Sequence, residues 1–211
     1  AHQMTLRMLQ LAGALPPMRG ILRKCYGWQD PQLAVQAFGL RFPNPVGLAA
    51  GYDKDGLGLH GLACLGFGHL ELGTVTPQGQ DGNPHPRIFR LPEDQALINR
   101  MGFPNAGAQA LLQRLQRARP QGVCLGINIG KGVDTPLEHA VGDYLILVRA
   151  FYAYADYLAV NISSPNTIGL RQLQARRYLD DLLGGLQSER LQLQAQHDRR
   201  VPLLVKLAPD L

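Results

Sequence analysis

The sequence has few cysteines, no long apolar run and no block of like charge. Its three cysteines, Cys25, Cys64 and Cys124, are far apart and have neither metal-binding nor redox spacing. They are typical of reduced thiols in a cytosolic protein, and no metal site is expected. No apolar run is long enough to cross a bilayer, and no segment resembles a cleaved signal peptide.

The positive charge is modest and lies mainly near the N-terminus. The 211 residues carry a formal net charge of +5 and are 45% hydrophobic, which is enough for a substantial core. Before position 45 the only acidic residue is Asp30, and the basic residues are Arg7, Arg19, Arg23, Lys24 and Arg41. Without a Lys/Arg block or an aromatic platform, this charge favours an anionic surface or substrate, and no nucleic-acid partner is expected.

Residues 1–28 predict two short helices, separated at Pro16 and Pro17. Both helices carry apolar stripes, at Met4, Met8, Leu11 and Leu15 in the first and at Met18, Ile21, Leu22 and Cys25 in the second. A basic amphipathic pair of this kind can lie on an anionic membrane surface. A helical hairpin packed on its own domain is the more common alternative. A linker rich in proline and glycine is expected to follow the pair.

From Phe42 onward, strand-like and helical segments alternate. Five apolar segments predict buried strands, at 45–51, 69–77, 123–131, 157–162 and 201–210. Helical segments lie between them, at 57–65, 106–118, 142–155 and 171–196. This alternation predicts a parallel sheet with right-handed crossovers, either an open doubly wound sheet or a (β/α)8 barrel.

The way in which the strands end favours the barrel. Each strand carries a polar residue near its C-terminal end, such as Asn128, Asn161 or Lys206, which suits a ligand lying across a barrel mouth. No strand ends in a G-x-G-x-x-G or P-loop sequence. Residues 78–103 interrupt the alternation and predict a hairpin over the top of the barrel. For 157–167 taken alone, a polar cap on the next helix is an equally good interpretation.

Six ordered segments carry a resemblance to a known family. They are AAGYDK at 49–54, GTVTP at 73–77, NRMGF at 99–103, GINIGK at 126–131, VNISSPNT at 160–167 and VKLAPD at 205–210. Together they resemble the dihydroorotate dehydrogenases, and more narrowly the membrane-associated, quinone-reducing class 2 enzymes of bacteria. The resemblance runs essentially from end to end.

This resemblance implies a specific redox reaction. The expected activity is oxidation of (S)-dihydroorotate to orotate in pyrimidine (UMP) biosynthesis. FMN is the expected hydride acceptor, and a membrane quinone is the expected final electron acceptor. The resemblance also implies a monomeric, peripheral protein on the cytoplasmic face of the cell membrane.

The resemblance implies a set of FMN contacts. The matching positions are Ala50, Gly51, Tyr52, Asp53, Lys54, Thr74, Asn128, Asn161 and Lys206. A flavin needs hydrogen bonds at its pyrimidine edge and, when reduced, a positive charge near N1 and O2. Amides and a hydroxyl of this set can supply the hydrogen bonds, and small residues let the backbone approach closely. Lys206 can supply the charge, the alternative being a lysine that snorkels to the surface.

The resemblance also implies substrate contacts from Lys54, Asn99, Arg100, Met101, Gly102, Phe103, Asn161 and Asn166. Orotate and dihydroorotate carry a carboxylate and ring amide groups, which a lysine and asparagine amides complement. An arginine in a loop, such as Arg100, is more often solvated.

The catalytic base implied by the resemblance is Ser164, which would remove the C5 proton while the hydride leaves C6. Serine is a poor base at its free pKa, so it needs a relay or an acidified C5 proton. Thr167 and Phe103 match positions that shape a proton exit route in the family. A serine here, with no cysteine nearby, separates the sequence from the soluble class 1 enzymes.

Two regions are expected, a helical membrane and quinone-tunnel region at 1–28 and a partial FMN-binding barrel at 29–211. The second contains about the first five βα units, whereas a full barrel needs about 250 residues. A sixth strand and the phosphate-binding loops are expected to be missing, so residues 1–211 alone are expected to be inactive.

Two other functions stay open at this point. One is another FMN-barrel reductase that acts on a uracil-type base, which predicts a cysteine acid and stronger basic patches. The other is a non-catalytic module that binds membrane surfaces, for which the basic amphipathic N-terminus is the argument.

Overall fold

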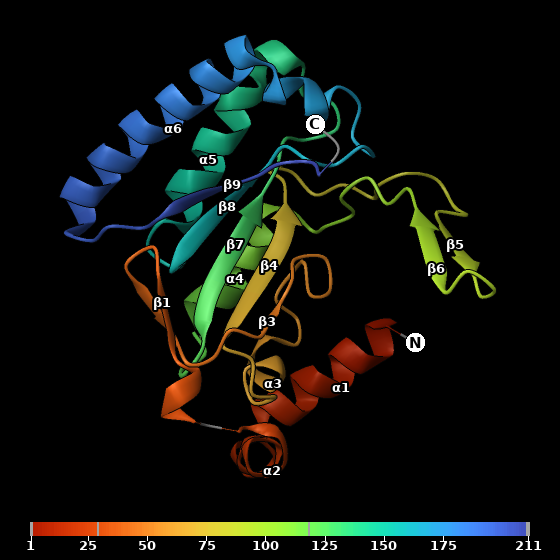
Figure 1. Cartoon of the computed structure of the whole chain (residues 1–211), viewed down its shortest axis with the longest axis vertical. Coiled ribbons are helices and arrows are strands. Elements are labelled where there is room, and N and C mark those ends of the chain that lie inside the picture. Colours follow the sequence, from red (N-terminus) through yellow and green to blue (C-terminus); the bar gives the residue numbers. More distant parts are fainter. Residues whose placement is uncertain (1, 29, 118, 210–211) are drawn as a thin grey trace.

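A five-stranded parallel sheet forms the centre of the molecule (Figure 1). The computed structural model describes residues 2–28, 30–117 and 119–209. Along the sheet the strands are β3 (Gly47–Leu48), β4 (His69–Val75), β7 (Cys124–Ile129), β8 (Tyr157–Asn161) and β9 (Leu203–Lys206). Parallel strands that are added in chain order are the arrangement of a (β/α)8 barrel. The predicted incomplete barrel is therefore confirmed, while the ends of two predicted segments, at 118 and 210, lie outside the described residues.

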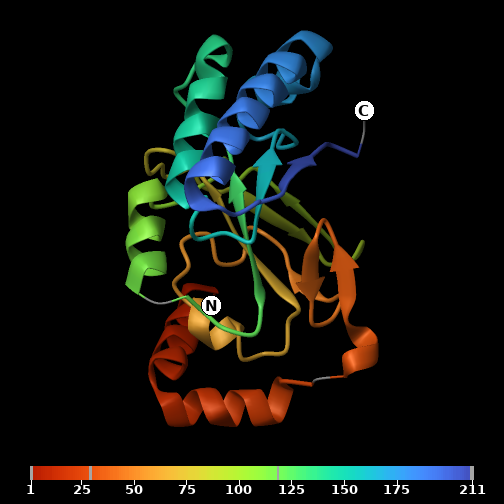
Figure 2. The ribbon, with the colours of Figure 1, turned by 90° about the vertical axis from the view of Figure 1, so that its left-hand side faces the viewer.

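Helices connect the strands and cover one face of the sheet. They are α3 (Leu59–Leu62), α4 (Ala108–Arg117), α5 (Ala140–Phe151) and α6 (Arg176–His197), and short 3-10 turns lie at η1 (Pro31–Leu33), η2 (Leu137–His139) and η3 (Leu170–Gln174). Figure 2 shows α4, α5 and α6 along the same side of the sheet. The helix predicted at 57–65 is shorter than expected: Gly58 precedes it, Gly61 lies within it, and glycine is a poor helix former.

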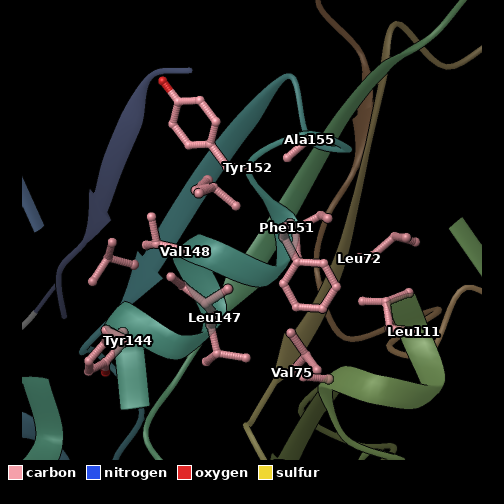
Figure 3. Close-up of a cluster of buried hydrophobic side chains, with 14 of the residues drawn as sticks. Leu72, Val75, Leu111, Tyr144, Leu147, Val148, Phe151, Tyr152 and Ala155 are labelled. Carbon is pink, nitrogen blue, oxygen red and sulfur yellow. The ribbon is translucent and has the colours of Figure 1, made fainter. Parts of the chain in front are cut away.

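The main core lies between the sheet and these helices. Leu72 and Val75 of β4 form one cluster with Phe151 of α5 and Leu111 of α4 (Figure 3). Each of these side chains is 1% exposed or less, and burying one contributes roughly 1.5–3 kcal/mol. Side chains of a strand alternate between its two faces, and a register shift between Leu72 and Val75 lets both reach the core, so the residues in between face the other side of the sheet. The apolar core therefore occupies one face and leaves the other for polar groups.

The two predicted N-terminal helices are present, as α1 (His2–Ala14) and α2 (Pro16–Tyr26). Leu6 and Gly13 of α1 are buried, and α1 packs on α3. A Cβ placed on Gly13 would lie 2.5 Å from the backbone nitrogen of Gly61, so the two backbones are in close contact. Away from this contact lies the predicted apolar stripe, which is 55–69% exposed: Met4, Met8, Leu11 and Leu15. No described helix has the length and apolar character needed to cross a bilayer.

A short hairpin occupies part of the expected linker before Phe42. Its strands β1 (Val35–Ala37) and β2 (Leu40–Phe42) are joined by Phe38 and Gly39. The φ angles of these two residues, 57° and 80°, give a tight two-residue turn. Phe42 packs against inward-facing residues near the N-terminal ends of β7 and β8. The hairpin therefore covers the inner face of the sheet at the end opposite to the polar strand ends.

A second hairpin lies in the excursion predicted at 78–103. It consists of β5 (Ile88–Leu91) and β6 (Ala96–Asn99) and extends away from the sheet (Figure 1). Two backbone hydrogen bonds between Gln80 and Asn105, of 2.9 and 3.0 Å, hold its base. The hairpin predicted within the excursion is confirmed, although it extends away from the sheet, and the segment that follows it reaches the cavity at the C-terminal ends of the strands.

Candidate active site

Four strands bring polar side chains to one edge of the sheet. Thr74, Asn128, Asn161 and Lys206 lie at or near the C-terminal ends of β4, β7, β8 and β9. Because parallel strands share one C-terminal edge, these distant sequence positions meet. The first three side chains are buried, and Lys206 pairs with Asn161 in the ladder between β8 and β9.

Hydrogen bonds join these side chains from Lys206 towards the centre of the sheet. The Lys206 ammonium group donates to Ser163 Oγ at 3.1 Å, and Ser163 Oγ donates to Asn161 Oδ1 at 2.9 Å. The Asn161 amide nitrogen donates to Thr74 Oγ1 at 2.9 Å. It also lies 3.2 Å from Asn128 Oδ1. Asn161 is therefore bonded on both sides, as a buried amide must be.

The same series of hydrogen bonds continues to Glu71. Thr74 Oγ1 donates to Asn128 Oδ1 at 2.5 Å, and Asn128 Nδ2 donates to Glu71 Oε1 at 2.8 Å. The Tyr157 hydroxyl donates to the second oxygen of Glu71 at 2.9 Å. We call these residues the floor network: Lys206, Ser163, Asn161, Thr74, Asn128, Glu71 and Tyr157.

A cavity of about 610 Å³ lies against the floor network, a size typical of small-molecule and cofactor sites. Most of the residues predicted from the sequence to contact FMN or substrate, and the predicted base Ser164, line it: Ala50, Gly51, Lys54, Thr74, Asn99, Met101, Gly102, Phe103, Asn128, Asn161, Ser164, Asn166 and Lys206. These residues come from the ends of five strands, from the loops that follow them and from the 78–103 excursion. The fold therefore brings the separate sequence motifs into one site.

Asp53 and Tyr52 belong to the same motif but do not line the cavity. The buried Asp53 carboxylate accepts hydrogen bonds from the backbone nitrogens of Leu57 and Gly58, both at 2.8 Å. Burial raises the pKa of this carboxyl above its ordinary value. The Tyr52 carbonyl accepts a hydrogen bond from the His2 ring at 2.6 Å. Asp53 thus stabilises the turn before α3, and Tyr52 connects this turn to α1.

Arg100 also lies outside the cavity lining. Its Nε donates to the Pro86 carbonyl at 3.0 Å, and its guanidinium lies 6.0 Å from the centre of the Phe89 ring. Both contacts are within the 78–103 excursion. In this structure Arg100 therefore supports the hairpin, and its side chain is exposed.

Lys54 is a cation on the cavity wall whose charge depends on pH near neutrality. Burial, together with the nearby positive charge of Arg87, lowers its pKa to about 8, although Asp55 opposes the shift. Desolvation disfavours an ammonium ion, and a bound anion would restore its charge. Lys54 is therefore suited to a carboxylate ligand.

The loop that follows β8 contacts the 78–103 excursion at the cavity. Ser164 Oγ accepts a hydrogen bond from the backbone nitrogen of Asn166 at 3.2 Å. The Asn166 side chain donates to Asn99 Oδ1 at 3.3 Å, and Asn83 donates to the Asn166 carbonyl at 3.1 Å. Two asparagine amides and a serine hydroxyl are thus gathered at one side of the cavity.

Several cavity residues were not assigned to the site from the sequence. Glu71 and Ser163 belong to the floor network, and Ile88 and Leu97 of the second hairpin add apolar wall. The position of Glu71 could have been read from alternation, because Leu70 and Leu72 on either side of it pack in the outer core. Ile88 and Leu97 carried no such signal, since their place depends on how the excursion folds back.

The cavity has the chemical features that a flavin requires. Hydroxyl and amide groups of the floor network offer both donors and acceptors, and Lys206 brings a positive charge. The wall at Ala50 and Gly51 is made of small residues, and a Cβ placed on Gly51 would meet no described atom within 4 Å. The backbone can therefore approach a planar ring closely at this wall.

Fold and site together define a (β/α)8-barrel protein with a ligand cavity at the C-terminal ends of its strands, the usual position of active sites in this fold. A sequence model of the family described as dihydroorotate dehydrogenase matches residues 32–211. The chain belongs to the dihydroorotate dehydrogenase family, whose members are flavin-dependent oxidoreductases.

Similar proteins from bacteria are named dihydroorotate dehydrogenase (quinone). The protein of Methylococcus capsulatus is 52% identical over 211 residues, which cover 100% of this chain and 60% of the relative. That of Chromobacterium violaceum is 55% identical with the same coverage of both chains. That of Xanthomonas oryzae pv. oryzae is 59% identical over 179 residues, or 85% of this chain and 51% of the relative. The chain spans about 60% or less of the length of these relatives.

A solved structure agrees with this assignment. The crystal structure of DHODH from Eimeria tenella in complex with ferulenol superposes with a TM-score of 0.84 at 40% identity. The similarity covers 100% of this chain and 59% of the Eimeria chain. The architecture described above is therefore that of part of a dihydroorotate dehydrogenase barrel.

Proposed function

We propose that the full-length form, meaning this sequence within a protein of the full length of its relatives, oxidises (S)-dihydroorotate to orotate. FMN is the hydride acceptor and a membrane quinone the final electron acceptor, in the biosynthesis of UMP. One observation carries the proposal: a single cavity of about 610 Å³ joins the floor network, Lys54 and Ser164 in a chain of this family.

FMN would occupy the part of the cavity next to the floor network, where it supplies a hydride acceptor. Thr74, Asn128 and Asn161 would hydrogen-bond its polar edge, and Lys206 would supply the positive charge that a reduced flavin needs. The small residues Ala50 and Gly51 would allow the backbone close to the ring. The support for this assignment is the donor, acceptor and charge pattern described above.

Dihydroorotate would lie between the cofactor and the loop after β8. Lys54 would pair with its carboxylate, while the Asn99 and Asn166 amides would complement the ring amide groups. These three residues line the same cavity as Ser164. Binding by several fixed groups would hold the C5 proton of the substrate towards the serine.

Ser164 would remove the C5 proton, with help, because a serine hydroxyl is a weak base. Help is available from Thr167, three positions further on. Its Oγ1 is buried and has no hydrogen-bond partner among the described residues. A buried hydroxyl without a protein partner can bind a water molecule, and such a water would connect Ser164 to Thr167. Phe103, also on the cavity wall, would limit the access of other solvent.

The helices α1 and α2 would mediate the membrane and quinone contacts. Their exposed apolar residues and the basic side chains Arg19, Arg23 and Lys24 suit a peripheral position on an anionic surface. We propose that this surface is the cytoplasmic face of the cell membrane and that the full-length form is a monomer.

A flavin titration tests the proposed function. The full-length form, purified and kept free of oxygen, is expected to show an oxidised flavin spectrum that bleaches when dihydroorotate is added. A soluble quinone is expected to restore the spectrum. A flavin that stays oxidised with excess dihydroorotate would contradict the proposal.

A further inference from the structure

Glu71 ends the floor network on the side opposite to Lys206. It points inward from β4, is half-buried, and lines the cavity. Both of its oxygens accept hydrogen bonds, from Asn128 Nδ2 at 2.8 Å and from the Tyr157 hydroxyl at 2.9 Å. Burial and the neighbouring carboxylate raise the pKa of the Tyr157 phenol, so it remains a donor. The Glu71 carboxylate carries no hydrogen to donate, so it can only accept hydrogen bonds from these two neighbours.

The network has a direction because its two ends have opposite hydrogen-bonding capacity. A lysine ammonium group can only donate, and a carboxylate can only accept. Lys206 begins the network and Glu71 ends it, so the groups between them donate in one sense, from Ser163 to Asn161, Thr74 and Asn128. The amides cannot turn over without placing like atoms in contact.

Asn128 shows what Glu71 contributes. If its amide were turned over, its oxygen would face Glu71 Oε1 at the 2.8 Å of the present contact. Its nitrogen would then face Asn161 Nδ2 at 3.2 Å. Both contacts would be repulsive, and a buried acceptor would lose its donor. The present orientation is therefore fixed at the Glu71 end as well as at the Asn161 end.

We propose that Glu71 is a positioning residue of the flavin pocket, which holds the Asn128 amide with its oxygen towards Thr74 and Asn161. Glu71 acts through Asn128, and the effect extends to the other polar groups that would meet the cofactor. This inference rests on the proposed function, since it concerns the fit of the pocket to a flavin.

An exchange of the two side chains tests the inference. In Asn128→Asp, two carboxylates face each other at the former 2.8 Å hydrogen bond, and we expect FMN to bind at least about tenfold more weakly. In the double variant Asn128→Asp/Glu71→Gln, the amide introduced at position 71 can donate to one oxygen of the carboxylate introduced at position 128. The other oxygen of that carboxylate can still accept from Thr74 and Asn161. We expect the double variant to bind FMN at least about fivefold more tightly than Asn128→Asp alone.

The sign of the Glu71→Gln effect is the decisive result. In the parent background it replaces a charged acceptor by a neutral one, and we expect FMN to bind about two- to fivefold more weakly. In the Asn128→Asp background the same substitution is expected to strengthen binding. Affinity is measured for the apo full-length form by quenching of FMN fluorescence, so that no reaction is required.

A matched control separates positioning from a general effect of charge. Glu189 forms a hydrogen-bonded pair with Arg149 on the outer helical layer, at 2.6 and 2.8 Å. The double variant Asn128→Asp/Glu189→Gln has the same net charge as the exchange variant and is expected to bind FMN no better than Asn128→Asp alone. Equal recovery in both double variants would overturn the inference, as would no recovery in either.

Thermal unfolding of the proteins without FMN is a second test of the inference. The repulsion between the two carboxylates in Asn128→Asp exists without cofactor, so the midpoint temperature of unfolding of this variant is expected to fall. The exchange variant is expected to restore the midpoint temperature. If Asn128→Asp does not fold, folding of the exchange variant is itself the recovery, and failure of both overturns the inference. A parent protein that folds but binds no FMN would instead refute the proposed function.

Discussion

The two faces of the sheet perform different tasks with neighbouring residues. On the outer face of β7, Ile127 and Ile129 are fully buried against the helices. Between them Asn128 points inward and belongs to the floor network. An outer residue needs only the right volume and an apolar surface. An inner residue needs particular partners in particular directions, so stability and chemistry are carried by alternate positions of one strand.

The largest expected effect lies on the inner side, at Ser164. We expect Ser164→Ala in the full-length form to slow flavin reduction by dihydroorotate on the order of 10²–10⁴-fold, the usual contribution of a positioned base. FMN should stay bound, because Ser164 has no place in the floor network. Stopped-flow absorbance without oxygen measures the reduction, and a rate equal to that of the parent would remove Ser164 from this role.

A core substitution on the outer face of the sheet should reduce stability and leave FMN binding unchanged. Phe151→Ala removes a fully buried ring from the cluster between α5 and β4. We expect a loss of about 3–5 kcal/mol in the free energy of unfolding, measured with urea. Phe151→Leu, which keeps most of the volume, should lose much less. The FMN affinity of the folded fraction should stay near that of the parent, and a large change in it would mean that the two faces are coupled.

The charge of Lys54 provides a prediction about pH. Its pKa of about 8 means that it is charged below pH 8 and loses its proton above. We therefore expect the affinity for dihydroorotate to be constant below pH 8 and to fall by about tenfold by pH 9. The dependence of flavin reduction on substrate concentration gives this affinity. The Lys54→Met variant should bind dihydroorotate weakly at every pH, without the fall in affinity between pH 8 and 9. If the parent protein keeps its affinity at pH 9, an ion pair between Lys54 and the substrate carboxylate is excluded.

Helix α1 repeats the division between two faces on a smaller scale. One face packs on α3 through Leu6 and Gly13, and the other exposes Met4 and Met8. We expect Met8→Gln to reduce partitioning of the full-length form to vesicles with anionic lipids by about threefold. Gln3→Ala, also exposed but off the stripe, serves as the control. Equal binding by both variants would show that the stripe does not meet the membrane.

Much of the fold could be predicted because the outer face repeats a simple pattern. The outward residues of β4, β7 and β8 are apolar, such as Ile127 and Ile129 of β7, and they give each strand a recognisable apolar run. The β1–β2 hairpin was missed because its turn begins at Phe38. This residue has a φ of 57°, which a bulky side chain rarely adopts. Gly39 was therefore the one turn signal in the sequence, and a bulky residue before it gave no support for a two-residue turn.

The site could be predicted in its members but less well in its connections. Thr74, Asn128 and Asn161 were recognised from separate motifs, whereas their hydrogen bonds span 33 to 87 positions. A sequence pattern cannot say which distant partner a buried amide meets. Glu71 was missed for this reason, since its role depends on its hydrogen bonds with Asn128 and Tyr157. Asp53 is the reverse case, a motif residue whose carboxylate is held by the backbone of its own turn.

The contact between Gly13 and Gly61 has a mechanical consequence for the N-terminal helix. Two backbones this close cannot turn past each other, because Gly61 fills the space of a side chain on Gly13 and the Leu9 backbone fills that of a side chain on Gly61. The rotation of α1 about its helix axis is thereby fixed relative to α3. The direction in which its exposed methionines point is fixed as well. Whatever surface the methionines meet, the barrel meets it at one fixed tilt.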